Sequence, residues 1–102
     1  GHAAANLMPV IAANRIGTET VTPCMENQQQ ESALTFYGTS FITDATGAVL
    51  QQASRDYAEI IQETFDLDEL ALTRRAWGVF RDRRPELYTP LLTQNGKDPF
   101  LK

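Results

Sequence analysis

Residues 34–50 read LTFYGTSFITDATGAVL, and this stretch carries the clearest β signal of the chain. The part from Leu34 to Asp44 is rich in Phe, Tyr, Thr and Ile, the residue types favoured in strands. Gly38 interrupts it, which predicts a bulge or a close approach of the backbone at that point. Residues 44–47, DATG, form a turn sequence, and residues 48–50, AVL, return as the partner strand. The stretch therefore predicts a β-hairpin.

The residues before this hairpin change character several times. Ala3 to Met8 contains good helix formers, and Pro9 stops that helix because proline lacks the N–H that a helix interior needs. Val10 to Ala13 is a short apolar run with β-branched residues, which predicts a strand buried on both faces. Thr18 to Thr22 alternates as a more exposed strand does, and Pro23 to Ser32 is polar enough to be a loop.

After the hairpin, Ile60, Ile61 and Phe65 predict a further strand. Asp66 then follows as a good N-cap residue, with Glu69 three positions on, as in a capping box. Apolar residues recur at helical spacing from there to Gly78, and from Val79 onward the chain is predicted to be an extended tail.

This inventory gives roughly four strands in a meander, with about a helix and a half to cover two sheet faces. These elements are too few to bury one another's apolar faces, so they do not close on themselves. We therefore expect more apolar surface than a soluble monomer usually exposes. In particular, Ile11, Phe41 and Ile42 should not all be deeply buried by contacts within the chain.

Composition excludes several classes of protein. The chain has 102 residues, enough for one domain or part of one. Its net charge of −4 and pI near 4.8 weigh against nucleic-acid binding. The longest apolar run, Leu7 to Ala13, is far shorter than the roughly 20 residues of a membrane-spanning helix. A single cysteine and the absence of an opening secretory signal favour a reducing compartment, the cytoplasm. The chain does not begin with Met, which we interpret as the mark of a fragment.

Cys24 is the first candidate for nucleophilic catalysis, and His2 is the only histidine. A cysteine needs a neighbouring base or positive charge to become a thiolate near neutral pH, yet Glu26 lies close in sequence. We interpret Cys24 as an inert loop thiol, although a pairing with His2 stays open. His2 lacks further ligands at metal spacing, and the acidic cluster at 66–69 fits helix capping. We expect no metal and no cofactor.

The tail combines aromatic side chains with a run of arginines at 81–84. Arginine and aromatic residues are enriched at protein interfaces, and arginine pairs readily with carboxylates. We predict a docking segment for subunit association, in which Arg83 or Arg84 forms a two-pronged bond to a carboxylate. The predicted interface residues are Trp77, Arg81, Arg83, Arg84 and Tyr88.

Several segments in the same order resemble the nitrilase superfamily of carbon–nitrogen hydrolases, and the last resembles the C-terminal tail of its N-carbamoylputrescine amidase subgroup. Relative to the family, the loop at 23–31 is longer than usual, and Ala5 stands where many members have glutamate. The segments that carry the resemblance are GHAAAN (1–6), PVIAANRIG (9–17), FYGTSFI (36–42), TGAV (46–49), FDLD (65–68) and WGVFRDRRPELY (77–88).

The resemblance implies an α/β fold, the C-terminal portion of a four-layer αββα sandwich. Within it this chain is mainly a β meander with a leading helix remnant, one short helix and an extended tail. Residues 1–102 would be the C-terminal part of a single hydrolase domain, with 89–102 as its tail. The expected partners are the remainder of that domain and further copies in a homodimer or higher homo-oligomer, with no nucleic acid and no membrane.

The resemblance also implies a small carbamoyl or amide substrate, most specifically N-carbamoylputrescine, hydrolysed to putrescine, ammonia and carbon dioxide. The family's Glu-Lys-Cys triad precedes the helix with which this chain begins, so the chain alone should be inactive. Asn14, at the end of what we take for a central strand, is the one residue predicted near substrate, against the alternative that it satisfies local backbone. Two other hypotheses stay open: a stand-alone β-rich interaction module, and a small thiol enzyme using Cys24 and His2.

Overall fold

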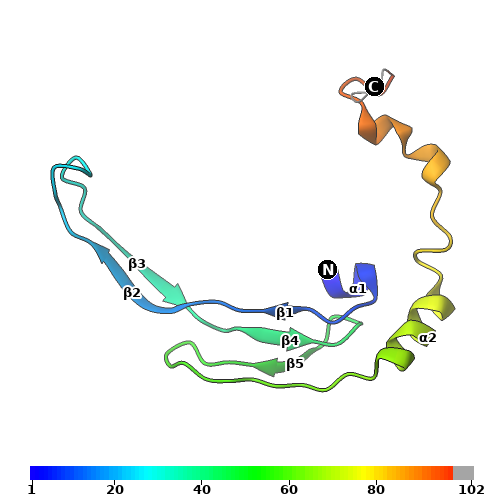
Figure 1. Cartoon of the computed structure of the whole chain (residues 1–102), viewed down its shortest axis with the longest axis horizontal. Coiled ribbons are helices and arrows are strands. Elements are labelled where there is room, and N and C mark those ends of the chain that lie inside the picture. The colour runs from blue at the N-terminus through cyan, green and yellow to red at the C-terminus, as the bar shows by residue number, and fades with distance from the viewer. Residues whose placement is uncertain (98–102) are drawn as a thin grey trace.

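The computed structural model describes residues 1–97 and contains two α-helices, five strands and two short 3₁₀ helices. Figure 1 shows that these elements form an open curve, with a long strand pair on one side and the C-terminal segment on the other. In chain order they are α1 (His2–Asn6), β1 (Ile11–Ala12), β2 (Ile16–Val21), β3 (Ser32–Tyr37), β4 (Phe41–Thr43), β5 (Val49–Gln52), α2 (Leu67–Trp77), η1 (Pro85–Leu87) and η2 (Thr89–Leu92).

The chain encloses very little core. Its radius of gyration is 21.3 Å, whereas a compact domain of this length has about 13 Å. Among the described residues, the buried apolar side chains are Ala3, Leu7, Ile42 and Ala45. Two of them belong to α1 and its C-cap and two to β4 and the turn after it, and helix α2 buries none of its residues. The expectation that the elements do not close on themselves is confirmed.

Strand β4 lies at the middle of a three-stranded antiparallel sheet, between β1 and β5. Ile42 is opposite Ile11 on one side and Gln51 on the other. The predicted meander is therefore wrong in its order, because β1 pairs with β4 and not with the strand that follows it. The run β1–β2 and the run β3–β4 are the two sides of one long bent hairpin (Figure 1).

Beyond the bend, β2 and β3 form a separate two-stranded sheet. We call residues 15–37, which comprise these strands and the loop between them, the arm. The hydroxyl oxygens of Thr18 and Thr35 are hydrogen-bonded across it at 2.9 Å, and the Arg15 guanidinium lies 4.3 Å from the centre of the Phe36 ring. Strand β3 contains no charged residue and pairs with β2 alone among the described strands.

The predicted turn at 44–47 is confirmed, and Asp44 organises it. Its Oδ1 accepts hydrogen bonds from the Thr46 amide at 2.8 Å, the Thr46 hydroxyl at 2.7 Å and the Ala48 amide at 3.0 Å. These bonds, chiefly those from Thr46, hold the pKa of the Asp44 carboxyl below its ordinary value. Gly47 has a φ of 94°, which its missing Cβ permits.

The N-cap at Asp66 and the end of α2 at Gly78 are also confirmed. The Asp66 side chain accepts from the amides of Asp68 at 2.9 Å and Glu69 at 3.0 Å, and Gly78 ends the helix with a φ of 65°. The first helix ends earlier than Pro9, because Leu7 takes the left-handed conformation at φ 48°. Five helical residues, not the six from Ala3 to Met8, precede that stop.

Two strand predictions are wrong. Residues 60–65 run alongside β5 (Figure 1) but do not form a strand, because their backbone makes no hydrogen bond to another backbone group among the described residues. The segment contacts β5 through a hydrogen bond of 3.4 Å from the Gln51 side chain to the Glu63 carboxylate, and Ile60 is 93% exposed. The Val10–Ala13 run is reduced to the two residues of β1 at the sheet edge, so it is not buried on both faces.

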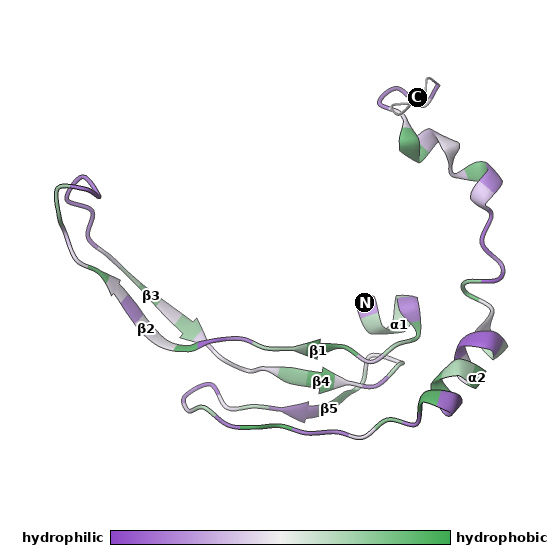
Figure 2. Cartoon of the chain, viewed as in Figure 1, coloured by the Kyte–Doolittle hydropathy of each residue, from purple (hydrophilic) through white to green (hydrophobic). Residues whose placement is uncertain are grey.

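The predicted apolar exposure is confirmed. Ile11 is 72% exposed and Phe41 is half-buried, whereas Ile42, between its two neighbouring strands, is only 4% exposed. Figure 2 shows hydrophobic residues along β4 and along the uncovered segment that leads to α2, while the far end of the arm is hydrophilic. The extended tail is interrupted by η1 and η2, and its last part, residues 98–102, lies outside the described residues.

Replacing Gly38 with alanine should destabilise the fold at the bend. A Cβ there would lie 2.6 Å from the Ser54 carbonyl oxygen and 2.7 Å from the Ile16 side chain, at a φ of 55°. We expect the free energy of unfolding to fall by roughly 2–4 kcal/mol, from strain and overpacking together.

Gly47→Ala is the matched control, because it has a positive φ but no atom within 4 Å of the added Cβ. It should cost about 1–2 kcal/mol from strain alone. Urea unfolding of the full-length protein carrying each substitution measures the difference. Equal losses would mean that the close approach at Gly38 carries no energy of its own.

Candidate functional site

Asn14 lies at the bend between β1 and β2, and its side chain is engaged with local backbone. Its Nδ2 donates to the Gly38 carbonyl oxygen at 2.9 Å, and its Oδ1 accepts from the Arg15 amide at 2.8 Å. The Asn14 amide in turn donates to the Ser40 hydroxyl at 2.8 Å. Asn14 thus ties the two sides of the long hairpin together, and β1 is an edge strand of the described sheet instead of a central one.

A shallow hollow of about 370 Å³ opens beside Asn14. Thr39, on its wall, has a φ of 56°, an uncommon conformation for a β-branched residue. Hydrogen bonds from its amide to the Ser54 carbonyl at 3.1 Å and from its hydroxyl to the Gly38 carbonyl at 2.7 Å hold it there. Nothing in the sequence pattern signals this strain. The hollow is lined by Ala12, Asn14, Tyr37, Gly38, Thr39, Ser40, Phe41, Val49 and Gln52.

Cys24 is exposed in the loop at the far end of the arm. The Asn27 side chain shapes this loop, because its Oδ1 accepts from the Cys24 amide at 3.0 Å and from the Gln30 amide at 3.1 Å. The pKa of the Glu26 carboxyl is lowered by hydrogen bonds from the Glu26 amide and from the Cys24 thiol. Figure 1 shows the loop at the far end of the arm, well away from α1, whose first residue is His2. The chain therefore does not bring a Cys24–His2 pair together.

In the tail, Arg81 forms a two-pronged ion pair within the chain. Its Nε and Nη2 donate to the two carboxylate oxygens of Asp82 at 2.7 and 2.9 Å, and its Nη1 donates to the Arg75 carbonyl at 3.3 Å. The bond to Arg81 and its positive charge lower the pKa of the Asp82 carboxyl. Arg81 thereby caps the C-terminal end of α2, where a positive charge is favourable. Sequence reasoning missed this role, and its own expectation of a two-pronged bond from Arg83 or Arg84 to a carboxylate at a subunit interface stays a prediction.

Arg83 and Arg84 also have local partners. The Arg83 guanidinium stacks 3.6 Å from the centre of the Phe80 ring, and its Nε donates to the Phe80 carbonyl at 2.8 Å. Arg84 pairs with Glu86, and its amide donates to the Tyr88 hydroxyl at 3.1 Å. Trp77 is 70% exposed. The five residues predicted for an interface thus lie on one exposed segment, residues 77–88, which we call the tail segment.

Within residues 1–97, no group of three or more His, Cys, Asp or Glu side chains is placed to hold a metal ion. None of the helices in this part of the chain is both long and apolar enough to cross a membrane.

Residues 1–75 match the model of the Carbon-nitrogen hydrolase family, and the chain belongs to that family. Among curated proteins it is 50% identical over 97 residues to an N-carbamoylputrescine amidase of Oryza sativa subsp. japonica, covering 95% of this chain and 31% of the relative. It is 47% identical over 92 residues to a citrullinase of Francisella tularensis, covering 90% and 29%.

A solved structure shows the same likeness. The carbon–nitrogen hydrolase from Helicobacter pylori G27 superposes with a TM-score of 0.73 at 39% identity, over 92% of this chain and 30% of that one. The chain thus spans about a third of the length of the relatives that it matches.

Removing the Arg81 side chain should loosen the end of α2. In Arg81→Ala, we expect several-fold faster amide hydrogen exchange at Gly78 and Asp82, whose amides donate to Arg74 and Gly78. Arg84→Ala is the control, because Arg84 is equally exposed but its ion-pair and hydrogen-bond partners, Glu86 and Tyr88, lie outside α2. Equal exchange in both variants would show that Arg81 does not cap the helix.

The same contact gives a pH dependence. Because folding lowers the Asp82 pKa below its ordinary 3.8, the ion pair contributes fully above that value and is lost as the pH falls through the folded pKa. After correction for intrinsic exchange rates, the protection of the wild-type Asp82 amide should therefore decrease as the pH is lowered from about 3.8. The Arg81→Ala variant should show no such decrease.

Proposed function

We propose that this chain is the C-terminal part of a carbon–nitrogen hydrolase whose substrate is N-carbamoylputrescine. The observation that carries the proposal is the identity of 44–50% with N-carbamoylputrescine amidases from four plants, over 94–97% of the chain. An alignment of that coverage takes in most of the tail segment, which lies beyond the residues matched by the family model.

In this proposal the catalytic groups lie outside the chain. A cysteine thiolate attacks the carbamoyl carbon, assisted by a glutamate base and a lysine that stabilises the developing charge. Ammonia or the amine leaves, water hydrolyses the acyl-enzyme, and the products are putrescine, ammonia and carbon dioxide. The chain supplies sheet and interface, and Asn14 would act at the bend by positioning the strand ends near the substrate.

The open shape supports a part of a larger domain over a stand-alone interaction module. A module that folds alone needs a core, yet the described residues bury only four apolar side chains. In the proposed enzyme, the exposed Ile11 edge and the unpaired backbone of residues 60–65 would be covered by the remainder of a four-layer αββα domain. We place that enzyme in the cytoplasm.

A second substrate has a specific observation in its favour, the 47% identity to a citrullinase. Citrulline and N-carbamoylputrescine share a terminal ureido group, so one mechanism serves both. They differ at the other end, where citrulline carries a carboxylate beside its amine. A site for citrulline must therefore offer a positive charge that a site for carbamoylputrescine does not need.

Ammonia release distinguishes the two. The full-length protein should hydrolyse N-carbamoylputrescine with at least a tenfold larger kcat/KM than citrulline, roughly 1.4 kcal/mol in transition-state binding. The 102-residue chain by itself should release none, and Cys24→Ala in the full-length protein should keep wild-type activity. The reverse preference would assign the chain to a citrullinase, and loss of activity in Cys24→Ala would restore Cys24 as a catalytic residue.

We also propose that the tail segment docks on another subunit of a homo-oligomer. Its exposed aromatics and arginines are of the types that interfaces concentrate. Losing one member of a desolvated arginine–carboxylate pair costs roughly 2–5 kcal/mol, since the other charge is left unpaired.

Arg83→Ala and Arg84→Ala in the full-length protein should therefore weaken self-association, most visibly on dilution. Sedimentation velocity over a concentration series measures the effect. An unchanged dissociation constant in both variants would reduce the tail segment to a clasp within one subunit.

A further inference from the structure

Charge is distributed very unevenly along the chain. Ten of the thirteen acidic residues precede residue 70, whereas five of the seven arginines lie between residues 74 and 84. A chain with a net charge of −4 thus carries one concentrated positive segment. Opposite charges on two surfaces of a protein steer those surfaces together when they lie on separate molecules.

The positive segment is hollowed on both sides of Phe80. One hollow, of about 320 Å³, is lined by Ala71, Arg74, Arg75, Phe80 and Arg81. The other, of about 280 Å³, is lined by Ala5, Asn6, Leu7, Arg74, Val79, Phe80 and Arg83. We call these two the arginine hollows.

The arginine hollows contain charge that is not neutralised by the described residues. The Arg75 guanidinium makes no hydrogen bond or ion pair with them, and Arg74 has a single contact of 3.5 Å to the Met8 sulfur. Arg81 is paired with Asp82, and Arg83 is stacked on Phe80. Arg74 and Arg75 are therefore available to a carboxylate from outside the chain.

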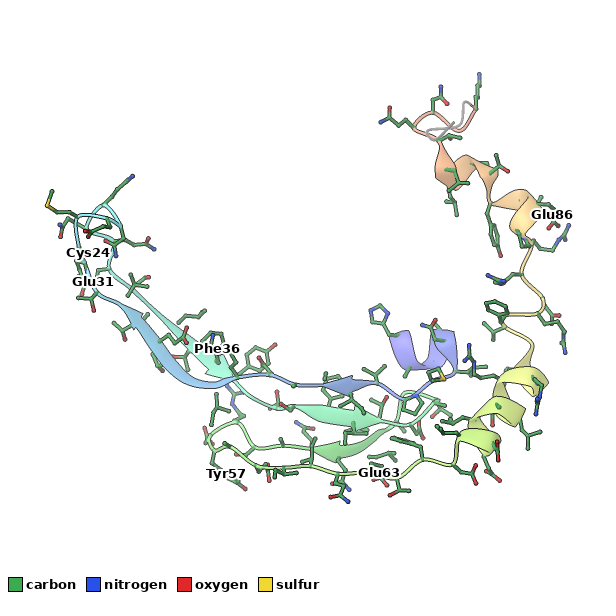
Figure 3. All side chains as sticks on the ribbon, viewed as in Figure 1. Cys24, Glu31, Phe36, Tyr57, Glu63 and Glu86 are labelled. Atoms are coloured by element: carbon green, nitrogen blue, oxygen red, sulfur yellow. The ribbon has the colours of Figure 1, made fainter. Side chains whose placement is uncertain are left out.

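The far end of the arm carries the complementary charge. Glu26 and Glu31 have no cationic partner among the described residues, whereas Glu19, nearer the bend, is paired with Arg15. Asn27 fixes the loop between them with three hydrogen bonds, so the two carboxylates are presented on an ordered turn. Figure 3 shows Glu31 at the opposite end of the molecule from the tail, where Glu86 is labelled. The arm cannot reach the arginine hollows of its own chain.

We propose that the arginine hollows of one copy receive the acidic end of the arm, Glu26 and Glu31, from a second copy. Each copy offers one arm and one pair of hollows, so a two-fold axis makes the contact reciprocal and closes it as a dimer. The inference rests on the proposed self-association of the full-length protein and adds a contact at the last turn of α2, next to the tail segment.

A charge swap in the full-length protein tests this contact. Glu31→Arg and Arg75→Glu should each raise the dimer dissociation constant roughly tenfold, because each turns an attraction into a repulsion. The double variant should return to within about threefold of wild type. Asp56→Arg and Arg55→Glu are the matched controls, since both residues are exposed outside the arm and the tail. Neither control should change the dissociation constant.

Rescue separates the contact from an effect on α2 itself, because an acidic residue near the helix C-terminus is unfavourable in any context. If Arg75→Glu weakens the dimer and Glu31→Arg does not restore it, the proposal is wrong. It is equally wrong if Glu31→Arg alone leaves the dissociation constant unchanged. A wild-type protein that is monomeric yet active on N-carbamoylputrescine would refute self-association while leaving the proposed reaction intact.

Cross-linking gives an independent readout. A benzophenone maleimide attached to Cys24, which lies on the same loop as Glu26, should photolabel peptides from residues 71–83. In a mixture of ¹⁴N- and ¹⁵N-labelled protein those cross-links should join different copies. Cross-links from Cys24 that map only to other surfaces, or only within one copy, would overturn the proposal.

Discussion

The hydrogen bond from the Asn14 side chain to the Gly38 carbonyl, 2.9 Å long, ties together the two sides of the long hairpin on which the sheet and the arm are built. It joins the two bends of the long hairpin at the point where one sheet ends and the arm begins. Glycine at position 38 permits the close packing at this point, because the Ser54 carbonyl and the Ile16 side chain occupy the space that a Cβ would need. The Ser40 hydroxyl completes the contact by bonding to the Asn14 amide. The pairing of β1 with β4 lies on one side of this contact and the pairing of β2 with β3 on the other, and the hollow opens beside it.

Local signals in the sequence predicted local structure correctly. The turn at Asp44 and the cap at Asp66 each depend on a side chain bonding to backbone within four residues, so composition and spacing were sufficient. The pairing of β1 with β4 joins residues some thirty positions apart, and no periodicity specifies it. The strand expected at residues 60–65 has the right residue types but finds no backbone partner among the described residues. A high strand propensity means that the side chains suit a half-buried, pleated surface. It does not mean that the backbone will find a strand to pair with.

The candidate sites show the same division. Asn14 was predicted as a site residue because it lies at a strand end. Its role in holding the bend depends on Gly38, twenty-four residues away. The tail was predicted to be an interface from its arginines and aromatics. Which arginine forms the two-pronged pair depends on the left-handed turn at Gly78, which returns Arg81 to the end of α2. Side-chain partners set by a backbone turn cannot be read from residue types alone.

Strand β3 has a consequence for how the chain behaves when it is separated from its surroundings. The sequence SALTFY offers six residues with no proline and no charge among them, along an edge that β2 leaves free in the described part of the chain. Such an edge is a template for intermolecular β-sheet, and stacked copies would form the ladder of an amyloid-like fibril. When expressed alone, the chain should therefore accumulate in inclusion bodies. A lysine at Thr35, whose side chain is exposed on the arm, is the natural gatekeeper to add.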